Sequence, residues 1–358
     1  MKIMHIVGNR PQFIKLAVLY PELAKQHHVE IIVHTGQHFD SNMSQIFFQD
    51  LQLPQPDHDL GINQLSHNQM IGSMLIALDK VLQEAQPNLV IVYGDTNSTL
   101  AGAIAARKKN IRLVHIEAGV RTGNEYMPEE ANRLVADRLS DINFCCTYLG
   151  MENLRAEGFS QGPNRSGFHL SGDLMLDAVK LFGPPSLNRK LSIESANQKR
   201  FVLATLHRQE NNEDLTNLRN IIEALNILHK QIPVIFPMHP KTKSILEKNK
   251  IPLKLDTCEP LGYIDMLHVL QNASSVVTDS GGLSREAFFF CKPTIVLMQH
   301  PFWPELFVHG NCLPSSAGTK EILSQYDALL QSNKPFNVDI FGNGHAAENI
   351  SQIISSIS

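Results

Sequence analysis

The chain has 358 residues, and its 31 basic and 35 acidic side chains give a formal net charge of −4. Such a balance offers no general attraction to nucleic acid or to an anionic membrane surface, so neither is expected as a partner. Hydrophobic residues make up 43% and charged residues 18%, which argues against a disordered chain and favours two domains of ordinary size.

The cysteine pattern and the first residues predict a reducing compartment. The five cysteines are odd in number and include no C-x-x-C, so neither a disulfide framework nor a zinc site is indicated. The start, MKIMHIVGNR, has a strand pattern and lacks the apolar region of a signal peptide. No run approaches the roughly 18 apolar residues of a membrane-spanning helix. We therefore expect a soluble, cytoplasmic protein.

The first half of the chain alternates short apolar runs with amphipathic segments. Strands are predicted at 3–7, 30–34, 89–92, 112–116 and 142–145, and helices at 11–25, 66–86 and 98–109. This alternation is typical of a parallel sheet covered by helices on both faces. A stretch around 161–165 with Gly, Pro and Asn marks a boundary, so the first domain is taken as 1–168.

The second half repeats the alternation. Strands are predicted at 201–205, 233–237, 275–278 and 294–297, and helices at 215–230, 242–250, 263–272 and 283–290. The second domain is taken as 169–342, with the polar, proline-containing stretch 182–199 as a surface excursion. A last helix in 343–358 could pack on either domain, including back on the first. Folds of this kind bind ligands at the carboxyl ends of their strands.

Acidic side chains gather at these strand ends in the first domain. Asp95 directly follows one buried strand, Glu117 follows the next, and Glu129 lies in the run Pro-Glu-Glu at 128–130. Each has an ordinary alternative, because Asp95 could cap a helix and acidic residues after a proline suit a helix start. Together they predict three carboxylates at one rim. Close carboxylates raise each other's proton affinity and can form acid–base pairs near neutral pH.

Cationic and histidine side chains also follow strands. Arg10 and Lys15 lie just after the first strand, where they could bind a phosphate or carboxylate or remain surface charges. His207 follows the first strand of the second domain, where it could transfer protons near pH 7 or be a structural histidine. His239 follows the next strand and is a further binding candidate.

The run TDSGGL at 278–283 has the pattern of an anion site, with a strand, a hydroxyl, two glycines and the N–H groups of a helix start. It lacks the lysine of a P-loop and the G-x-G-x-x-G spacing, so a nucleoside diphosphate fits better than a Mg-dependent triphosphate. Glu286 follows on the first turns of that helix and could reach a ribose diol or lie on the surface. No pattern in the chain indicates a metal site.

Seven motifs occur in the order and spacing of the non-hydrolysing UDP-N-acetylglucosamine 2-epimerases, a family that the chain resembles from residue 3 to about 325. They are GNRPQFIK at 8–15, TGQH at 35–38, GDT at 94–96, HIEAGVR at 115–121, PEEANR at 128–133, HRQE at 207–210 and TDSGG at 278–282. The resemblance implies a GT-B fold, two Rossmann-like α/β domains whose parallel sheets face each other across a cleft. It also implies reversible conversion of UDP-GlcNAc to UDP-ManNAc for cell-surface polysaccharide precursors.

The resemblance also implies roles for single residues. The positions that match catalytic residues of the family are Asp95, Glu117, Glu129 and His207. The candidates for binding UDP and substrate, from matching positions, shared motifs and strand ends, are Arg10, Lys15, Arg133, His239, Ser280, Gly281, Gly282 and Glu286. Gln37 and His38 match a region near a second, regulatory UDP-GlcNAc site. The family uses no metal and no nicotinamide and is typically a homodimer, so a UDP-amino sugar and a second copy of the chain are the expected partners.

Two places depart from the family's pattern. The run HPFWPE at 300–305 plainly keeps only the family's Pro-Glu, and Gln69 stands where an arginine often serves the regulatory site. The sugar therefore stays open between UDP-GlcNAc and a related UDP-acetamido sugar. Three other functions stay open as well: a hydrolysing 2-epimerase that releases ManNAc and UDP, a GT-B glycosyltransferase with a separate acceptor, and a non-catalytic sugar-nucleotide sensor.

Overall fold

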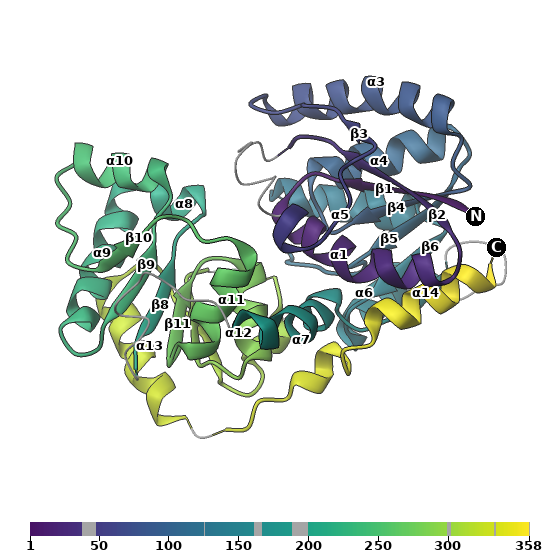
Figure 1. Ribbon diagram of the computed structural model, residues 1–358. Coiled ribbons are helices and arrows are strands. Elements are labelled where there is room, and N and C mark those ends of the chain that lie inside the picture. Colours follow the sequence, from purple (N-terminus) through teal and green to yellow (C-terminus); the bar gives the residue numbers. More distant parts are fainter. Residues whose placement is uncertain are drawn as a thin grey trace. The chain divides into compact units, whose positions relative to one another are not determined.

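The computed structural model describes residues 1–37, 48–124, 126–160, 167–187, 200–298, 302–332 and 334–357. The chain forms two compact units, one from Met1–Lys180 with Asp339–Ser358 and one from Leu181–Val338 (Figure 1). Each unit is built on an open sheet whose strand pairs are all parallel and whose faces carry helices. The prediction of two Rossmann-like α/β domains is confirmed.

The sheet of the first unit has seven strands in the order β3-β2-β1-β4-β5-β6-β7. The strands are β1 Lys2–Val7, β2 Val29–His34, β3 His58–Asp59, β4 Leu89–Tyr93, β5 Arg112–Ile116, β6 Ile142–Cys145 and β7 Gly167–Leu170. The helices are α1 Arg10–Lys25, α3 His67–Ala85, α4 Asn97–Lys108, α5 Pro128–Leu139, α6 Tyr148–Ala156 and α7 Leu174–Ser186. The strand order reverses between β1 and β4, the kind of switch point where open α/β sheets bind ligands.

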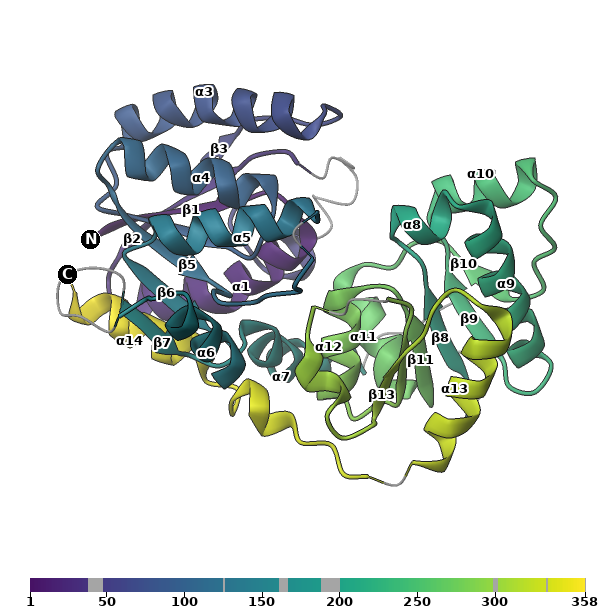
Figure 2. The same cartoon turned by 180° about the vertical axis from the view of Figure 1, so that it is seen from behind.

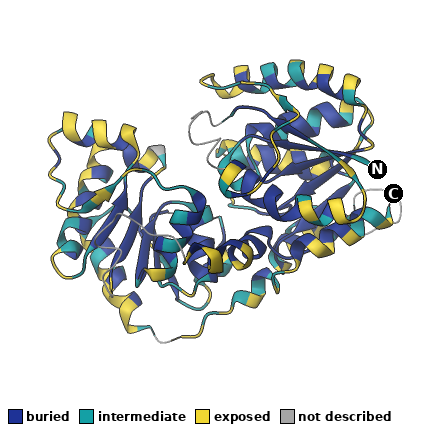
Figure 3. Cartoon of the chain, in the orientation of Figure 1, coloured by how far each residue is buried: buried dark blue, intermediate teal, exposed yellow. Residues whose placement is uncertain are grey.

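The central strands of this sheet are buried on both faces, which explains their apolar sequences. All five side chains of β4 are buried, and Figure 3 shows the strands as the darkest part of the unit. On one face, Met74 and Leu78 of α3 and Ala103 of α4 join Val90 and Val92 of β4 in a single apolar cluster. A parallel strand covered on both sides must be apolar throughout, so its position could be predicted from the sequence.

The C-terminal helix, α14 Ala346–Ser356, belongs to the first unit (Figure 2). Ser351 Oγ donates to the carbonyl oxygen of Glu22 in α1 at 3.0 Å, and the side chains of Ile350 and Ile354 are fully buried. The chain leaves this unit after Lys180 rather than at the predicted 168/169, because β7 pairs with β6 inside the first sheet. It returns at Asp339, four residues before the predicted 343.

The sheet of the second unit has six strands in the order β10-β9-β8-β11-β12-β13. The strands are β8 Val202–Thr205, β9 Val234–Pro237, β10 Asp256–Cys258, β11 Ser275–Thr278, β12 Thr294–Val296 and β13 Cys312–Pro314. The α-helices are α8 Gln209–Asn212, α9 Leu215–His229, α10 Pro240–Lys248, α11 Tyr263–Asn272, α12 Gly281–Phe289 and α13 Thr319–Gln331. Short 3₁₀ turns occur at Pro304–Phe307 in this unit and at Val338–Phe341, where the chain returns to the first unit.

The predicted surface excursion at 182–199 is wrong for its first part. Residues up to Ser186 continue α7, and the Phe182 ring is buried with its centroid 5.9 Å from that of Tyr263. The aromatic contact outweighs the two prolines that suggested a loop. Residues 188–199 lie outside the described part of the chain. In the described ranges, no helix combines the length and apolar character needed to cross a bilayer.

Candidate active site

Asp95 follows β4 and is held by two residues of α5. Arg133 donates from Nη2 to Asp95 Oδ2, and from Nη1 to Glu130 Oε2 at 2.7 Å. Asn132 donates from Nδ2 to the carbonyl oxygen of Asp95 at 2.8 Å. The Arg133 side chain is 3% exposed, whereas that of Asp95 keeps 26%. The carboxylate is therefore fixed in place but remains partly open to solvent.

Glu117 follows β5, the neighbour of β4, and pairs with Lys15 of α1. Lys15 Nζ lies 2.6 Å from Glu117 Oε2, and the two side chains are 3% and 10% exposed. Glu117 has a φ of +74°, a left-handed backbone conformation that is uncommon for a residue with a side chain. Both backbone and ion pair thus fix this carboxylate at the same sheet edge as Asp95.

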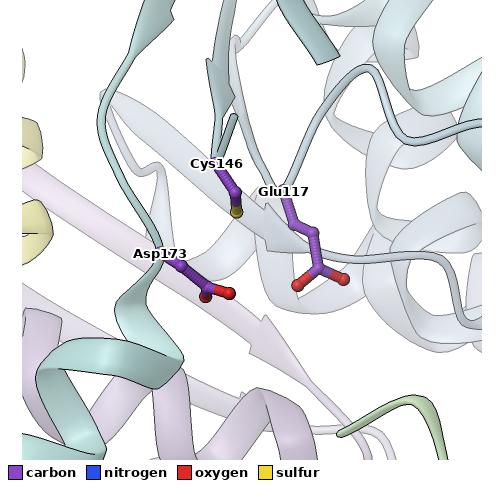
Figure 4. Close-up of side chains that lie close together, drawn as sticks. All are labelled: Glu117, Cys146 and Asp173. Carbon is purple, nitrogen blue, oxygen red and sulfur yellow. The ribbon is translucent and has the colours of Figure 1, made fainter. Parts of the chain in front are cut away.

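Two further side chains approach Glu117 from the next two strand ends (Figure 4). One oxygen each of Glu117 and Asp173 and the Cys146 sulfur all lie within 4.8 Å of one another. This trio is the group within the described residues that could hold a metal ion. The Lys15 ammonium already neutralises Glu117 there, which argues against an added cation. Cys146 and Asp173 were not predicted, although each closely follows a predicted or observed strand.

The other predicted residues of the first unit have different surroundings from these carboxylates. Arg10 begins α1 and is half-buried, and Glu129 is half-buried in the first turn of α5. Gln37 Oε1 accepts hydrogen bonds from the backbone N–H and the hydroxyl of Ser98, at 3.0 and 2.8 Å. His38 lies outside the described residues. The predicted regulatory role of this segment stays a prediction.

Gln12, which the sequence analysis did not single out, ties two strand ends together. Its Nε2 donates to the carbonyl oxygen of Tyr93 at 2.7 Å, and its Oε1 accepts from the N–H of Gly8 at 2.7 Å. The side chain is buried. Gln12 lies inside the first motif, at 8–15, and that position was the signal that could have identified it. A buried amide needs several hydrogen-bond partners, and here Gly8 and Tyr93 provide them.

The loop after Glu117 depends on a glycine. Gly119 has a φ of +77°, and an added Cβ would lie 2.2 Å from the carbonyl oxygen of Gly150. Gly123, in the same loop, has a φ of +71° but nothing within 4 Å of such an atom. The two glycines therefore have the same left-handed backbone conformation, but only Gly123 has room for a side chain.

We expect Gly119→Ala to destabilise the protein more than Gly123→Ala. Either alanine pays about 1–2 kcal/mol for its left-handed backbone, and only the first adds about 1–3 kcal/mol for overlap with Gly150. Chemical denaturation of both variants measures the difference. Equal free energies of unfolding would mean that the Gly150 carbonyl moves away without cost.

In the second unit, the buried carboxylate of Asp279 organises the loop after β8. It accepts hydrogen bonds from the backbone N–H groups of His207 and Arg208, at 2.9 and 3.0 Å, and from Asn211 Nδ2 at 3.0 Å. Asp279 follows β11 directly, so it links the ends of two neighbouring strands. The His207 side chain is exposed.

The start of α12 has the features expected of an anion site. Ser280 Oγ accepts from the N–H of Leu283 at 3.2 Å and so caps the helix. The Arg208 guanidinium lies 4.7 Å from the centroid of the Phe302 ring, and a Cβ on Gly281 would lie 3.0 Å from that ring. A cation and a glycine-rich helix start therefore adjoin one aromatic side chain.

The remaining binding candidates of this unit lie on two different helices, α12 and α10. Gly282 follows in the first turn of α12, and Glu286 is buried further along the helix. His239 is exposed and caps another helix, α10, where its Nδ1 accepts from the N–H of Lys241 at 3.2 Å. His239 thus has a structural role at the end of β9.

Comparisons with known proteins extend over both units. A family model described as UDP-N-acetylglucosamine 2-epimerase matches residues 21–355. A UDP-2,3-diacetamido-2,3-dideoxy-D-glucuronate 2-epimerase of Pseudomonas aeruginosa is 41% identical over 100% of both chains. A UDP-N-acetylglucosamine 2-epimerase of Methanococcus maripaludis is 36% identical over 99% of this chain and 98% of that one. The crystal structure of Methanocaldococcus jannaschii UDP-GlcNAc 2-epimerase with UDP-GlcNAc and UDP has a TM-score of 0.90 at 32% identity, over 99% and 100% of the chains.

Proposed function

The chain belongs to the UDP-N-acetylglucosamine 2-epimerase family, and from this premise we propose that it interconverts UDP-GlcNAc and UDP-ManNAc by eliminating and re-adding UDP. Membership confirms the resemblance found in the sequence and makes the protein an isomerase. The observation that carries the proposed mechanism is the pair of fixed carboxylates, Asp95 and Glu117, at the ends of adjacent strands.

The chemistry explains why such carboxylates are needed. The C2 proton of the sugar is not next to a carbonyl group, so it is not acidic. Breaking the C1–O bond first releases UDP with the bonding electrons and leaves positive charge at C1, which loosens that proton. A carboxylate then takes the proton, and the C–H electrons form a C1=C2 double bond. Return of a proton to the opposite face of C2, with re-addition of UDP at C1, gives the epimer.

We assign the leaving UDP to the second unit. The first N–H groups of a helix have no acceptor within the helix, so the Gly281-Gly282 start of α12 can bind diphosphate oxygens. Arg208 adds a positive charge nearby, and His207 is exposed in the loop that Asp279 holds. These groups would stabilise the charge that develops on UDP as the C1–O bond breaks.

A second substrate is favoured by one specific observation. The Pseudomonas aeruginosa relative, which is 41% identical over its full length, carries the name of a UDP-2,3-diacetamido-2,3-dideoxy-D-glucuronate 2-epimerase. The departure at 300–305 points the same way, because that run follows a strand and keeps little of the family's pattern. We therefore propose this diacetamido uronate as the alternative substrate of the same reaction.

We expect deuterium to enter C2 when the protein turns over its substrate in deuterated water. Each UDP sugar is incubated separately, and NMR follows the C2 position and the appearance of the manno epimer. Exchange with only the diacetamido uronate would replace the first substrate by the second. Stoichiometric release of free UDP would indicate the hydrolysing reaction, and transfer only to an added acceptor would indicate a glycosyltransferase. The homodimer and the cytoplasmic location stay predictions.

A further inference from the structure

His115 is a fully buried histidine of β5 whose two ring nitrogens both face acceptors. Nδ1 lies 2.7 Å from Asp137 Oδ1, and Nε2 lies 2.7 Å from the carbonyl oxygen of Gly94. A carbonyl oxygen cannot donate a hydrogen bond, and neither can an ionised carboxylate. Nε2 of His115 therefore carries a hydrogen when it bonds the Gly94 carbonyl, while Asp137 lies against the other ring nitrogen.

The surroundings of Asp137 favour its ionised form. Its Oδ2 lies 2.7 Å from Arg121 Nη2 and accepts a hydrogen bond from the N–H of Gly119 at 3.2 Å. Burial alone would raise the pKa of Asp137, but the hydrogen bonds and charges of His115 and Arg121 outweigh burial, and the pKa is lowered. Arg121 is shared with Glu157, which accepts from its Nε at 2.6 Å. The Arg121 guanidinium therefore lies between the carboxylates of Asp137 and Glu157.

This pair reaches the backbone beside both fixed carboxylates. Gly94 immediately precedes Asp95, and its N–H also donates to the carbonyl oxygen of Ile116 at 2.9 Å. Gly119 lies two residues after Glu117. Asp137 is on α5, the same helix from which Arg133 holds the Asp95 side chain. One helix thus fixes the loops after β4 and β5 through the buried contact between His115 and Asp137.

We propose that His115 and Asp137 are positioning residues for the 2-epimerase reaction, holding the loops that carry Asp95 and Glu117 at a fixed separation. This role rests on the proposed function, because it matters only if those carboxylates act on one sugar. Neither residue is proposed to touch substrate. Their contribution is to geometry, and a misplacement of about 1 Å can cost about 10²-fold in rate.

The test compares His115→Phe and Asp137→Asn with a matched control, His5→Phe. His5 is also fully buried in the first sheet and paired with a carboxylate, since its Nε2 lies 2.9 Å from Glu30 Oε2. Its Nδ1 lies 2.7 Å from the hydroxyl of Tyr93, a β4 side chain, rather than from the backbone of Gly94. We expect both His115→Phe and Asp137→Asn to lower kcat about 10²-fold. Phenylalanine cannot bond Gly94 or Asp137, and an asparagine that accepts from His115 must turn its NH2 group toward the N–H donors of Arg121 and Gly119. For both, KM should change less than about threefold, and His5→Phe should change only thermal stability. An unchanged kcat in His115→Phe, or an equal loss in His5→Phe, would overturn the proposal.

A second measurement does not depend on activity. In histidine-labelled wild-type protein, nitrogen NMR should show a hydrogen on Nε2 of His115, the ring nitrogen that faces the Gly94 carbonyl oxygen. An Nε2 without a hydrogen could not bond that carbonyl and would overturn the proposal. If Nε2 carries the hydrogen but the wild type exchanges deuterium into no UDP sugar, the proposed function fails and the His115–Gly94 hydrogen bond stands.

Discussion

Replacing Lys15 by methionine should lower the free energy of unfolding by about 3–5 kcal/mol, because the buried Glu117 carboxylate loses its ammonium partner. The two charged atoms lie 2.6 Å apart and both side chains are almost fully covered. Methionine is nearly as long as lysine, so lost packing contributes little. Urea denaturation of the wild type and the variant measures the change.

The double variant Lys15→Met with Glu117→Gln separates stability from catalysis. Glutamine removes the charge and keeps the size of the side chain, so we expect most of the lost stability to return. Turnover should stay about 10²–10⁴-fold below that of the wild type, the usual contribution of an acid–base group. Recovery of activity together with stability would reduce Glu117 to a structural partner of Lys15.

An exposed ion pair of the same unit provides the control. Lys109 Nζ lies 2.8 Å from Asp79 Oδ1, but the side chains are 31% and 60% exposed. Lys109→Met should cost less than about 1 kcal/mol, because water screens the pair and solvates the remaining carboxylate. A cost as large as that of Lys15→Met would show that methionine itself, rather than loss of a buried charge pair, causes the effect.

The elements that could be predicted from the sequence are those whose residues carry their own signal. The run at 89–92 is apolar throughout because β4 is covered on both faces, and Asp95 and Glu117 were found because they follow such runs. By contrast, β3 at His58–Asp59 and β10 at Asp256–Cys258 are short, polar edge strands. They are strands only because β2 and β9 supply backbone partners, which no local pattern reveals.

The partners within the candidate site were the part that sequence could not supply. Lys15 and Arg133 were predicted to bind substrate, and in the structure they pair with Glu117 and Asp95. Each pair joins residues far apart in the chain, so spacing carries no trace of it. Asp279 likewise belonged to a predicted anion run, but its oxygens accept backbone N–H groups from a loop about 70 residues away. Hydrogen bonds between distant parts of the chain therefore decide which charged side chains are paired within the protein and which can bind a ligand.

Asp95→Asn should lower turnover by about 10²–10⁴-fold and leave the affinity for UDP close to that of the wild type. Asparagine keeps an oxygen that can accept from Arg133, so the position of the side chain should survive while its basicity is lost. UDP affinity is retained because the diphosphate is assigned to the start of α12. Initial rates of epimerisation and calorimetric titration with UDP measure the two quantities.

Asp141→Asn is the matched control for this change. Asp141 Oδ1 lies 3.1 Å from Arg107 Nη1, and the side chain is 21% exposed, close to the 26% of Asp95. Asp141 precedes β6, however, so it lies at the amino ends of the parallel strands, whereas Asp95 lies at their carboxyl ends. Its replacement should affect stability and leave turnover unchanged. Equal losses of turnover in the two variants would mean that breaking an aspartate–arginine pair disturbs the sheet as a whole. Asp95 would then have no demonstrated part in proton transfer.

A different result would identify a sugar-nucleotide sensor. In that case the wild type and Asp95→Asn would bind UDP-GlcNAc equally tightly, and neither protein would turn it over.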